Sequence, residues 1–444
     1  MSKIDAQLKL ESLMLHGGHE ADPTTGARVT PIYQTASYNF KSTEHAANLF
    51  GLKEFGNTYT RLMNPTTDVF EKRMTILEGG VGALAVSSGL SAIMIALMNI
   101  AQNGDEVVSM DNLYGGTYAQ FRNIFPRMGI TVKFVNSDDI NALKKAIGPK
   151  TKAVYAETVG NPKLNVLDIE KVSAIAHQHG IPLVLDNTVT PYILRPFDFG
   201  ADIVVYSATK FIGGHGSSLG GVIIDSGKFD WTNGNFPLIA DDDPAHHGRN
   251  FIKEFAHLGN MAYILKARFS MLRQMGQALS PFNSFLFIQG IETLHLRMPR
   301  HCENSLKVAQ FLSKHKLVSW VNYPGLPQSP YKKLAKKYLS KGAGAMIGFG
   351  IKGGAKAGKK FIESLQMILH LANIGDTMTL AIHPATTTHF QLSVEEQAAC
   401  GVTPDFIRLS IGIEHVDDII SDIAQALSKS QRRSYARTKP RKKG

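Results

Sequence analysis

The sequence predicts an α/β protein in which a mainly parallel sheet is followed by a smaller α+β unit. Three observations indicate this fold class. Between residues 83 and 224, short β-rich runs alternate with helix-length segments. These runs are almost continuously apolar, as strands are when helices cover both faces of a parallel sheet. Beyond Pro281, a long helical pattern over residues 284–311 is followed by a turn-rich stretch and then by further strand and helix patterns up to Leu427.

The expected elements follow one another in this order. Residues 1–60 contain many turn signals and little periodicity, which predicts an arm rather than a domain. Strands are then expected at GALAV, EVVSM, TVKFV, KAVYAE, PLVLDN, DIVVYS and LGGVII. Amphipathic helices are expected between them, for example over residues 138–147 and 168–179. We therefore predict a large domain over residues 61–280, a smaller domain over residues 281–428 and a tail over residues 429–444.

Composition and charge narrow the class of protein. The chain has 444 residues, of which 43% are hydrophobic and 19% charged, so it can bury a large core. Its formal net charge is +11, but residues 429–444 hold eight Lys or Arg and no acid, which leaves +3 on the rest. A basic run of this kind is typical of a solvated tail, with weak binding to RNA, a membrane or an acidic partner as the alternative. Nucleic-acid binding is therefore not expected of the body of the chain.

The sequence also carries expectations about location. No apolar stretch reaches the roughly 18 residues that a membrane helix needs, so we expect no membrane span. The first 15 residues are amphipathic and contain acids, unlike a secretory signal or a typical transit peptide. Cys302 and Cys400 lie far apart without metal-site spacing, which is typical of packed thiols in a reducing compartment. We therefore predict a cytoplasmic protein.

Polar groups follow several of the predicted strands, at the edge of the sheet where α/β proteins bind ligands. Ser87-Ser88-Gly89 separates a strand from a helix, where free N–H groups attract a phosphate. The other groups are Tyr114 at a strand-to-helix turn, Asn161 before a proline, Asp186 at one strand end, and Ser207, Thr209 and Lys210 at another. A lysine there is costly to desolvate unless its amine is neutral, paired or covalently used. A phosphate cradle, an acid, an aromatic face and a lysine are together the groups of a pyridoxal phosphate site.

Three other motifs allow different interpretations. SATK at 207–210 fits the S-x-x-K signature of serine acyl enzymes, but no S-D-N or K-T-G follows. Residues 348–353 match G-x-G-x-x-G, yet no acid stands about 20 residues further on after a second strand, which favours a glycine turn. DDDPAHHG at 241–248 could be imagined as a metal cluster, but adjacent histidines rarely share one face for ligation, so we expect an exposed polar loop and no metal.

Longer motifs point to a family. They extend from Leu10 to about Leu427 and include TPIYQTASYNF, YTRLMNPTTDVFEKRMTILEGG, LYGGTY, ETVGNP, DNTVTPYILRPFDFGADIVVYSATKFIGGHG and IRLSIGIEHVDDI. With these motifs the chain resembles the pyridoxal phosphate-dependent enzymes of Cys/Met metabolism. The resemblance implies the fold of the fold-type I, aspartate aminotransferase-like enzymes, with pyridoxal 5'-phosphate bound in the large domain.

The resemblance also implies which residues hold the cofactor. Lys210 would bind it covalently and shuttle protons, Asp186 would pair with its ring nitrogen, and Tyr114 would stack on the ring. Asn161 would contact the ring oxygen. The phosphate would be held by Ser88, Gly89, Leu90, Ser207 and Thr209.

Further residues are implied for the substrate and the assembly. Arg408 would bind the substrate carboxylate, with Thr379 nearby. Tyr59 and Arg61 would reach the phosphate of a neighbouring subunit, and Tyr59 would also contact substrate and take part in catalysis with Tyr114. The resemblance therefore implies a homo-oligomer, which we expect to be a tetramer built from dimers with shared sites.

The implied activity is γ-replacement, in which sulfide takes the place of acetate on O-acetylhomoserine and gives homocysteine for methionine biosynthesis. Gly116 stands where γ-lyase relatives tend to have a cysteine, and the GNFPLIADDDPAHHG insertion is shorter in cystathionine γ-synthases and γ-lyases. Met378 and Thr386 stand where the family often has other polar residues. Cystathionine γ-synthesis, γ-elimination, an O-succinyl or O-phospho donor and a methanethiol acceptor therefore stay open as alternatives.

Overall fold

The structure is a computed structural model that describes residues 7–388, 390, 397 and 401–431. Its larger sheet has the strand order β1-β7-β6-β5-β4-β2-β3. The strands run parallel except for β7, which lies antiparallel between β1 and β6. Their bounds are β1 Gly82–Val86, β2 Glu106–Met110, β3 Thr131–Val135, β4 Thr151–Glu157, β5 Leu183–Asp186, β6 Ile203–Ser207 and β7 Gly221–Asp225. Each overlaps one of the seven predicted runs, so the predicted mainly parallel sheet is confirmed.

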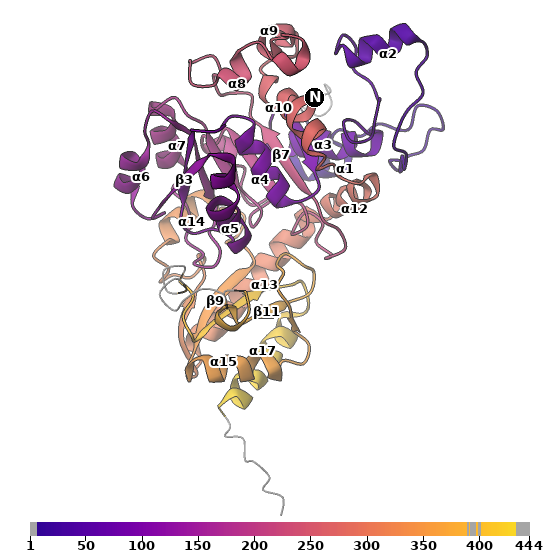
Figure 1. Ribbon diagram of the computed structural model, residues 1–444. Coiled ribbons are helices and arrows are strands. Elements are labelled where there is room, and N and C mark those ends of the chain that lie inside the picture. Colours follow the sequence, from indigo (N-terminus) through magenta and orange to yellow (C-terminus); the bar gives the residue numbers. More distant parts are fainter. Residues whose placement is uncertain (1–6, 389, 391–396, 398–400, 432–444) are drawn as a thin grey trace, which may run out of the picture.

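Helices in the first part of the chain connect and cover these strands (Figure 1). α4 contacts β6 and β7, α7 contacts β5, and α3 contacts β1. Their bounds are α1 Leu10–His16, α2 Thr43–Phe50, α3 Pro65–Glu78, α4 Gly89–Met98, α5 Gly115–Asn123, α6 Ile140–Ala146, α7 Ile169–Gln178, α8 Pro237–Ala240, α9 Phe251–Glu254, α10 Ala262–Lys266 and α11 Arg273–Met275. The two helices expected within residues 138–147 and 168–179 are α6 and α7. One π-helical segment, η6 Ala267–Leu272, joins α10 to α11.

A second, smaller sheet lies in the later part of the chain, with the order β10-β11-β12-β9-β8. Its strands are β8 Val318–Asn322, β9 Met346–Ile351, β10 Leu369–His370, β11 Leu380–Ile382 and β12 Phe406–Ser410. The accompanying helices are α12 Pro281–Glu292, α13 Leu294–Lys314, α14 Lys332–Tyr338, α15 Gly354–Ser364 and α17 Val416–Ser430. The helical pattern at 284–311 is thus two helices, since Thr293 between them has a non-helical backbone (φ −109°, ψ 3°).

The glycine turn predicted at residues 348–353 is wrong for its first two glycines. Gly348 and Gly350 lie inside β9, and only Gly353 turns the chain, with φ 103°, before α15. A β-carbon on Gly348 would lie 2.7 Å from the ring of Phe406 on the neighbouring strand. This glycine therefore permits close packing of two strands, which a sequence motif alone does not reveal.

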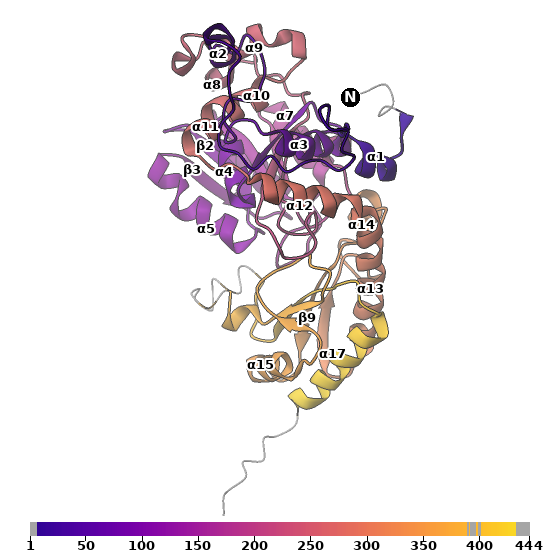
Figure 2. The same ribbon diagram turned by 90° about the vertical axis from the view of Figure 1, so that its right-hand side faces the viewer.

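Buried apolar side chains form one cluster around the larger sheet and another around the smaller one. Figure 2 shows the smaller sheet below the larger one, with α13 running between the two regions. α1 contacts α3 and α12, whereas α2 lies far from the sheet, beside α9 in both views.

The predicted domain boundaries stay a prediction. Cys400 and residues 432–444 of the predicted tail lie outside the described residues, and Cys302 is buried. Within the described ranges, no helix combines the length and apolar character needed to cross a membrane.

Candidate active site

The carboxyl ends of the parallel strands meet at one edge of the larger sheet, and a cavity opens there. Its wall includes most of the predicted site residues, namely Ser88, Gly89, Leu90, Tyr114, Asn161, Asp186, Ser207, Thr209, Lys210 and Arg408. The first nine come from the larger sheet and its loops, and Arg408 comes from β12 of the smaller sheet. The fold thus brings together residues that are more than 300 positions apart in the sequence, Ser88 and Arg408.

Lys210 stands three positions after the end of β6. Its Nζ donates a hydrogen bond to Oδ1 of Asn373 at 2.5 Å. Burial and, secondarily, the nearby Arg408 guanidinium lower the pKa of Lys210 to about 8. A lysine amine with such a pKa has a substantial neutral fraction near neutral pH, so it can act as a nucleophile or a base.

Two carboxyl groups stand side by side at the ends of β4 and β5. Glu157 and Asp186 are the last residues of these strands and are paired in register. Asp186 Oδ1 accepts from the Thr188 amide at 2.9 Å, and burial raises the pKa of this carboxyl. Glu157 accepts from the Tyr114 amide at 2.5 Å, and burial followed by the proximity of Asp186 raises its pKa well above the ordinary value. Two desolvated acids at neighbouring strand ends are costly to ionise together.

The first turn of α4 lies against the end of β6. Ser88 caps this helix, and its Oγ accepts from the Ser91 amide at 3.1 Å. A β-carbon on Gly89 would lie 2.6 Å from Cβ of Ser207, so only glycine lets the two segments approach this closely. Thr209 completes the group, with its Oγ1 accepting from the Gly220 amide at 3.1 Å. A helix N-terminus surrounded by hydroxyl groups is suited to hold an anion.

Arg408 is held inside the cavity wall, with only 8% of its surface exposed. Its Nη1 donates to Oδ1 of Asn161 at 3.2 Å, and its Nη2 to the Asn373 carbonyl at 3.4 Å. Burial lowers the pKa of Arg408 to about 10, which still leaves the guanidinium charged at neutral pH. The cavity therefore contains a fixed cation opposite the strand ends.

Glu157 and Asn373 are cavity residues that the sequence analysis did not single out. Glu157 could have been found, because it ends the apolar run KAVYAE as Asp186 ends PLVLDN. Asn373 carried no comparable signal. It lies in the loop between β10 and β11, and only the packing of the smaller sheet brings it to Lys210.

Three predicted residues do not line this cavity. Tyr59 lies at the end of the arm and is 44% exposed, and the guanidinium of Arg61, just after the arm, stands 5.2 Å from the centre of the Tyr59 ring. Thr379 is buried beside Glu414, to which its amide and hydroxyl donate at 2.5 and 2.8 Å. The contacts predicted for these three residues stay predictions.

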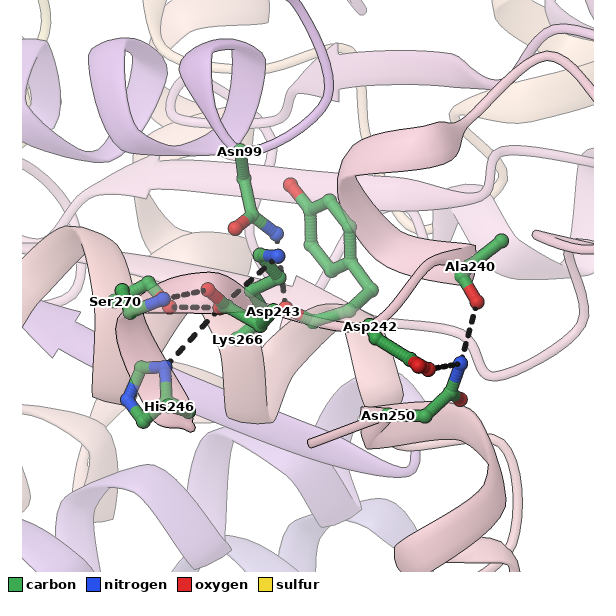
Figure 3. Close-up of polar contacts among 10 residues, drawn as sticks. Asn99, Ala240, Asp242, Asp243, His246, Asn250, Lys266 and Ser270 are labelled. Carbon is green, nitrogen blue, oxygen red and sulfur yellow. Dashed lines mark hydrogen bonds and ion pairs between the residues drawn. The ribbon is translucent and has the colours of Figure 1, made fainter. Parts of the chain in front are cut away.

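Six of the eight residues in the segment 241–248 are exposed, as expected of a polar loop, but Asp243 and His246 are buried against that expectation. Asp243 and His246 are 6% and 7% exposed. Oδ2 of Asp243 lies 3.1 Å from Nδ1 of His246 and from Nζ of Lys266, and 3.2 Å from the Ser270 hydroxyl (Figure 3). These partners offset the cost of burying the carboxylate. In the part of the chain that the structure describes, no group of His, Cys, Asp or Glu has the geometry of a metal site.

Comparison with known proteins agrees with this geometry. The family model described as Cys/Met metabolism PLP-dependent enzyme matches residues 11–428. The chain belongs to this family. Among curated members, O-acetyl-L-homoserine sulfhydrylase from Leptospira meyeri is 55% identical and covers 94% of this chain and 96% of its own. Homocysteine synthase from Schizosaccharomyces pombe is 52% identical, covering 94% and 97%.

A solved Cys/Met metabolism enzyme has the same fold. The crystal structure of a putative O-acetylhomoserine (thiol)-lyase from Campylobacter jejuni superposes with a TM-score of 0.91 at 39% identity, covering 95% of this chain and all of that one. That structure contains N'-pyridoxyl-lysine-5'-monophosphate. The predicted fold and the predicted dependence on pyridoxal phosphate are therefore confirmed.

The cavity residues fit this cofactor. Gly89 brings the N-terminus of α4 against Ser207, where a β-carbon would lie 2.6 Å from Cβ of Ser207, and this helix end with its hydroxyl groups lines the cavity and suits a phosphate. Asp186 offers a buried carboxyl that accepts from neutral donors, among them the Thr188 amide and, at 3.5 Å, the Tyr155 hydroxyl. The protonated ring nitrogen of the cofactor would give this carboxyl a charged partner. Lys210, with its lowered pKa, lines the same cavity and is suited to react with an aldehyde.

Proposed function

We propose that the chain is an O-acetylhomoserine sulfhydrylase, which replaces the acetate of O-acetyl-L-homoserine with sulfide and forms homocysteine in methionine biosynthesis. The observation that carries the chemistry is the meeting of Lys210, Asp186 and Arg408 at one cavity. The choice of substrate rests on relatives, because a sulfhydrylase for O-acetyl-L-homoserine and a homocysteine synthase are 55% and 52% identical to the chain.

The cofactor roles follow the cavity wall. Lys210 would bind the cofactor covalently, Asp186 would face its ring nitrogen, Tyr114 would stack on its ring and Asn161 would contact its ring oxygen. The phosphate would lie among Ser88, Gly89, Leu90, Ser207 and Thr209. The support for this arrangement is that all of these residues line one cavity.

Arg408 is proposed to bind the α-carboxylate of the substrate. A buried guanidinium facing a carboxylate gains roughly 1.5–3 kcal/mol for each charged hydrogen bond. Asn161 and the Asn373 carbonyl hold the guanidinium in place, so the carboxylate would meet donors that are already oriented. The bound amino acid would then be oriented toward Lys210, which lines the same cavity.

Lys210 is proposed to move the protons of the reaction on its Nζ. Pyridoxal phosphate, when bound, supplies an electron sink that stabilises negative charge on the substrate carbons. Lys210 would take a proton from Cα and then one from Cβ, and return them at the end. Its pKa of about 8 suits this work, because a general base is most effective near the operating pH. The Cγ–O bond breaks with its electron pair leaving on acetate, and sulfide supplies the pair for the new Cγ–S bond.

We further propose that Tyr59 and Arg61 serve the site of a neighbouring subunit, in a tetramer that is built from two dimers and located in the cytoplasm. Their positions support this proposal, since neither lines the cavity of its own chain and Tyr59 is 44% exposed. Tyr59 would also contact the substrate there. Any nucleic-acid binding would be confined to the basic tail, and the domains would divide as the sequence predicts.

The test is an assay of acetate release and homocysteine formation with and without sulfide. A sulfhydrylase forms both products in equal amounts, and only when sulfide is present. Acetate or ammonia release without sulfide would instead identify γ-elimination. Turnover of an O-succinyl donor in preference to the acetyl ester would overturn the substrate assignment. Lys210→Ala serves as the inactive control.

A further inference from the structure

The helix that runs from α10 through η6 to α11 contains a π-helical segment, Ala267–Leu272, and this segment carries Arg268. The guanidinium of Arg268 donates from Nη1 to the Leu62 carbonyl at 2.8 Å. From Nη2 it donates to Oε2 of Glu71 at 2.6 Å and to the Ala83 carbonyl at 3.1 Å. One side chain thus joins the turn at Leu62, just after the arm, to α3 and β1. π-Helical turns within α-helices are frequent at functional sites.

The Leu62 contact lies at the turn that carries Tyr59 and Arg61. The amides of Leu62 and Met63 both donate to the Tyr59 carbonyl, at 2.9 and 3.2 Å. Because the Leu62 carbonyl is held by Arg268, the position of this turn depends on where the guanidinium stands. In the described part of the chain, no other side chain is recorded as bonding this carbonyl.

Glu71 extends the connection to the strand before the phosphate cradle. Its side chain is 6% exposed, and its Oε1 accepts from the Ala85 amide of β1 at 2.7 Å. β1 ends at Val86, two positions before Ser88. The Arg268–Glu71 pair therefore connects the Tyr59–Leu62 turn of one chain with the strand that leads into that chain's own cavity.

The opposite side of the same helix is fixed by the buried cluster of Figure 3. Lys266 and Ser270 both point to Oδ2 of Asp243, at 3.1 and 3.2 Å. Phe269 adds a ring contact with Phe55 of the arm, at 6.4 Å between centroids. Contacts on both sides of η6 hold its backbone in place, so the guanidinium of Arg268 projects from a rigid support.

We propose that Arg268 is a positioning residue that sets the Tyr59–Arg61 turn for the active site of the neighbouring subunit. The inference rests on the proposed function, in which that turn serves the neighbour's cofactor phosphate. Arginine is required at this position because its planar fork reaches acceptors on separate segments, whereas lysine offers one ammonium group. A purely structural ion pair with Glu71 would not need the Leu62 contact.

The first test is the variant Arg268→Lys in the full-length protein. It keeps a cation beside Glu71 but gives up the fork that reaches Leu62. We expect the amides of Leu62 and Met63 to exchange hydrogen about tenfold faster, the effect of losing one charged hydrogen bond. Arg300→Lys is the matched control, since Arg300 pairs with Glu303 at 3.7 Å on the exposed side of α13. Unchanged exchange at Leu62 and Met63 in Arg268→Lys would overturn the proposal.

The second test asks whether the effect reaches the neighbouring subunit. Mixed oligomers are assembled from Lys210→Ala subunits and Arg268→Lys subunits. In some of their sites, the Lys210→Ala subunit supplies an intact Tyr59–Arg61 turn and the Arg268→Lys subunit supplies an intact Lys210. These mixed oligomers should therefore be more active than oligomers of either variant alone. Hybrids of Lys210→Ala with Arg61→Ala test the shared site by itself. If the hybrids with Arg61→Ala recover activity and the hybrids with Arg268→Lys do not, the positioning role of Arg268 is wrong. If both fail, the shared site is absent and the inference falls with it.

Should Arg268→Lys prove unstable, the pair Glu71→Gln with Arg268→Gln removes both buried charges together. This double variant avoids leaving one charge unpaired, which is the main cost of breaking a buried ion pair. Its amides at Leu62 and Met63 should again exchange faster than in the wild type. Wild-type exchange rates in the double variant would equally overturn the proposal.

Discussion

The lowered pKa of Lys210 has two physical causes that a mutation can separate. Burial of the amine is the larger cause, and the positive charge of Arg408 is the second. Replacing Arg408 with glutamine removes the charge but leaves the cavity largely closed. We therefore expect the pKa of Lys210 to rise above 8 in Arg408→Gln while staying below the ordinary value of 10.5.

The size of the effect follows from the two pKa values. At a pH of about 7.5, an amine with a pKa of about 8 is roughly one quarter neutral, whereas one at 10.5 is only about 0.1% neutral. The difference amounts to about 3 kcal/mol against the charged form. Arg408→Gln should therefore lower the neutral fraction of Lys210 measurably, but by far less than this full range of about 240-fold.

The assay is reductive methylation of the cofactor-free protein over a range of pH, with each lysine located by mass spectrometry. Only the neutral amine reacts, so the rate at Lys210 should level off above a pH of about 8. The exposed Lys314 provides an internal reference. Arg408→Lys is the control variant, since it retains the positive charge and should retain the lowered pKa.

Two results would refute this reasoning. In the first, Lys210 in the wild type follows the same pH profile as Lys314, which would mean that the amine is not desolvated. In the second, Arg408→Gln and Arg408→Lys shift the profile equally, which would mean that the charge of Arg408 does not act on Lys210.

Three further predictions concern the cradle, the ring partner and the core. Gly89→Ala should reduce the cofactor retained after gel filtration about tenfold or more, since its β-carbon would lie 2.6 Å from Cβ of Ser207. Asp186→Asn should weaken cofactor binding to a similar degree, measured by titration of the cofactor-free protein, because a neutral amide replaces a charged partner. Glu78 has a pKa raised to about 7 by burial, so it favours folding below its unfolded value near 4.5 and loses this contribution, up to about 3 kcal/mol, as pH rises through 7. Glu78→Gln should therefore raise the melting temperature relative to the wild type more at pH 8 than at pH 5.

The strands and the chemistry at their ends could be predicted because a parallel sheet buries both faces of each strand. An apolar run such as residues 203–206 then has one interpretation, and a lysine directly after it has few structural explanations. Asp186 and Lys210 were found in this way. Arg408 was assigned only through the family resemblance, because β12 lies in the other sheet and its polar residue follows no comparable rule.

The segment 241–248 shows why burial of polar residues is harder to predict. Its acids and histidines are what an exposed loop contains, and the pattern gave no sign of a core. Asp243 is buried because its partners Lys266 and Ser270 arrive from another helix, 23 and 27 positions later. The partners that offset the cost of burying a charge can be distant in sequence. They are therefore recognised only in the folded chain.

Burial moves the pKa values of two acids and two bases in the cavity wall toward the neutral form. Lys210 and Arg408 are lowered, Asp186 and Glu157 are raised, and burial is the first cause in each case. A cavity that disfavours charge on both its acids and its bases is incomplete without a ligand that brings charges of its own. A ring nitrogen facing Asp186 and a carboxylate facing Arg408 would each restore a charged partner.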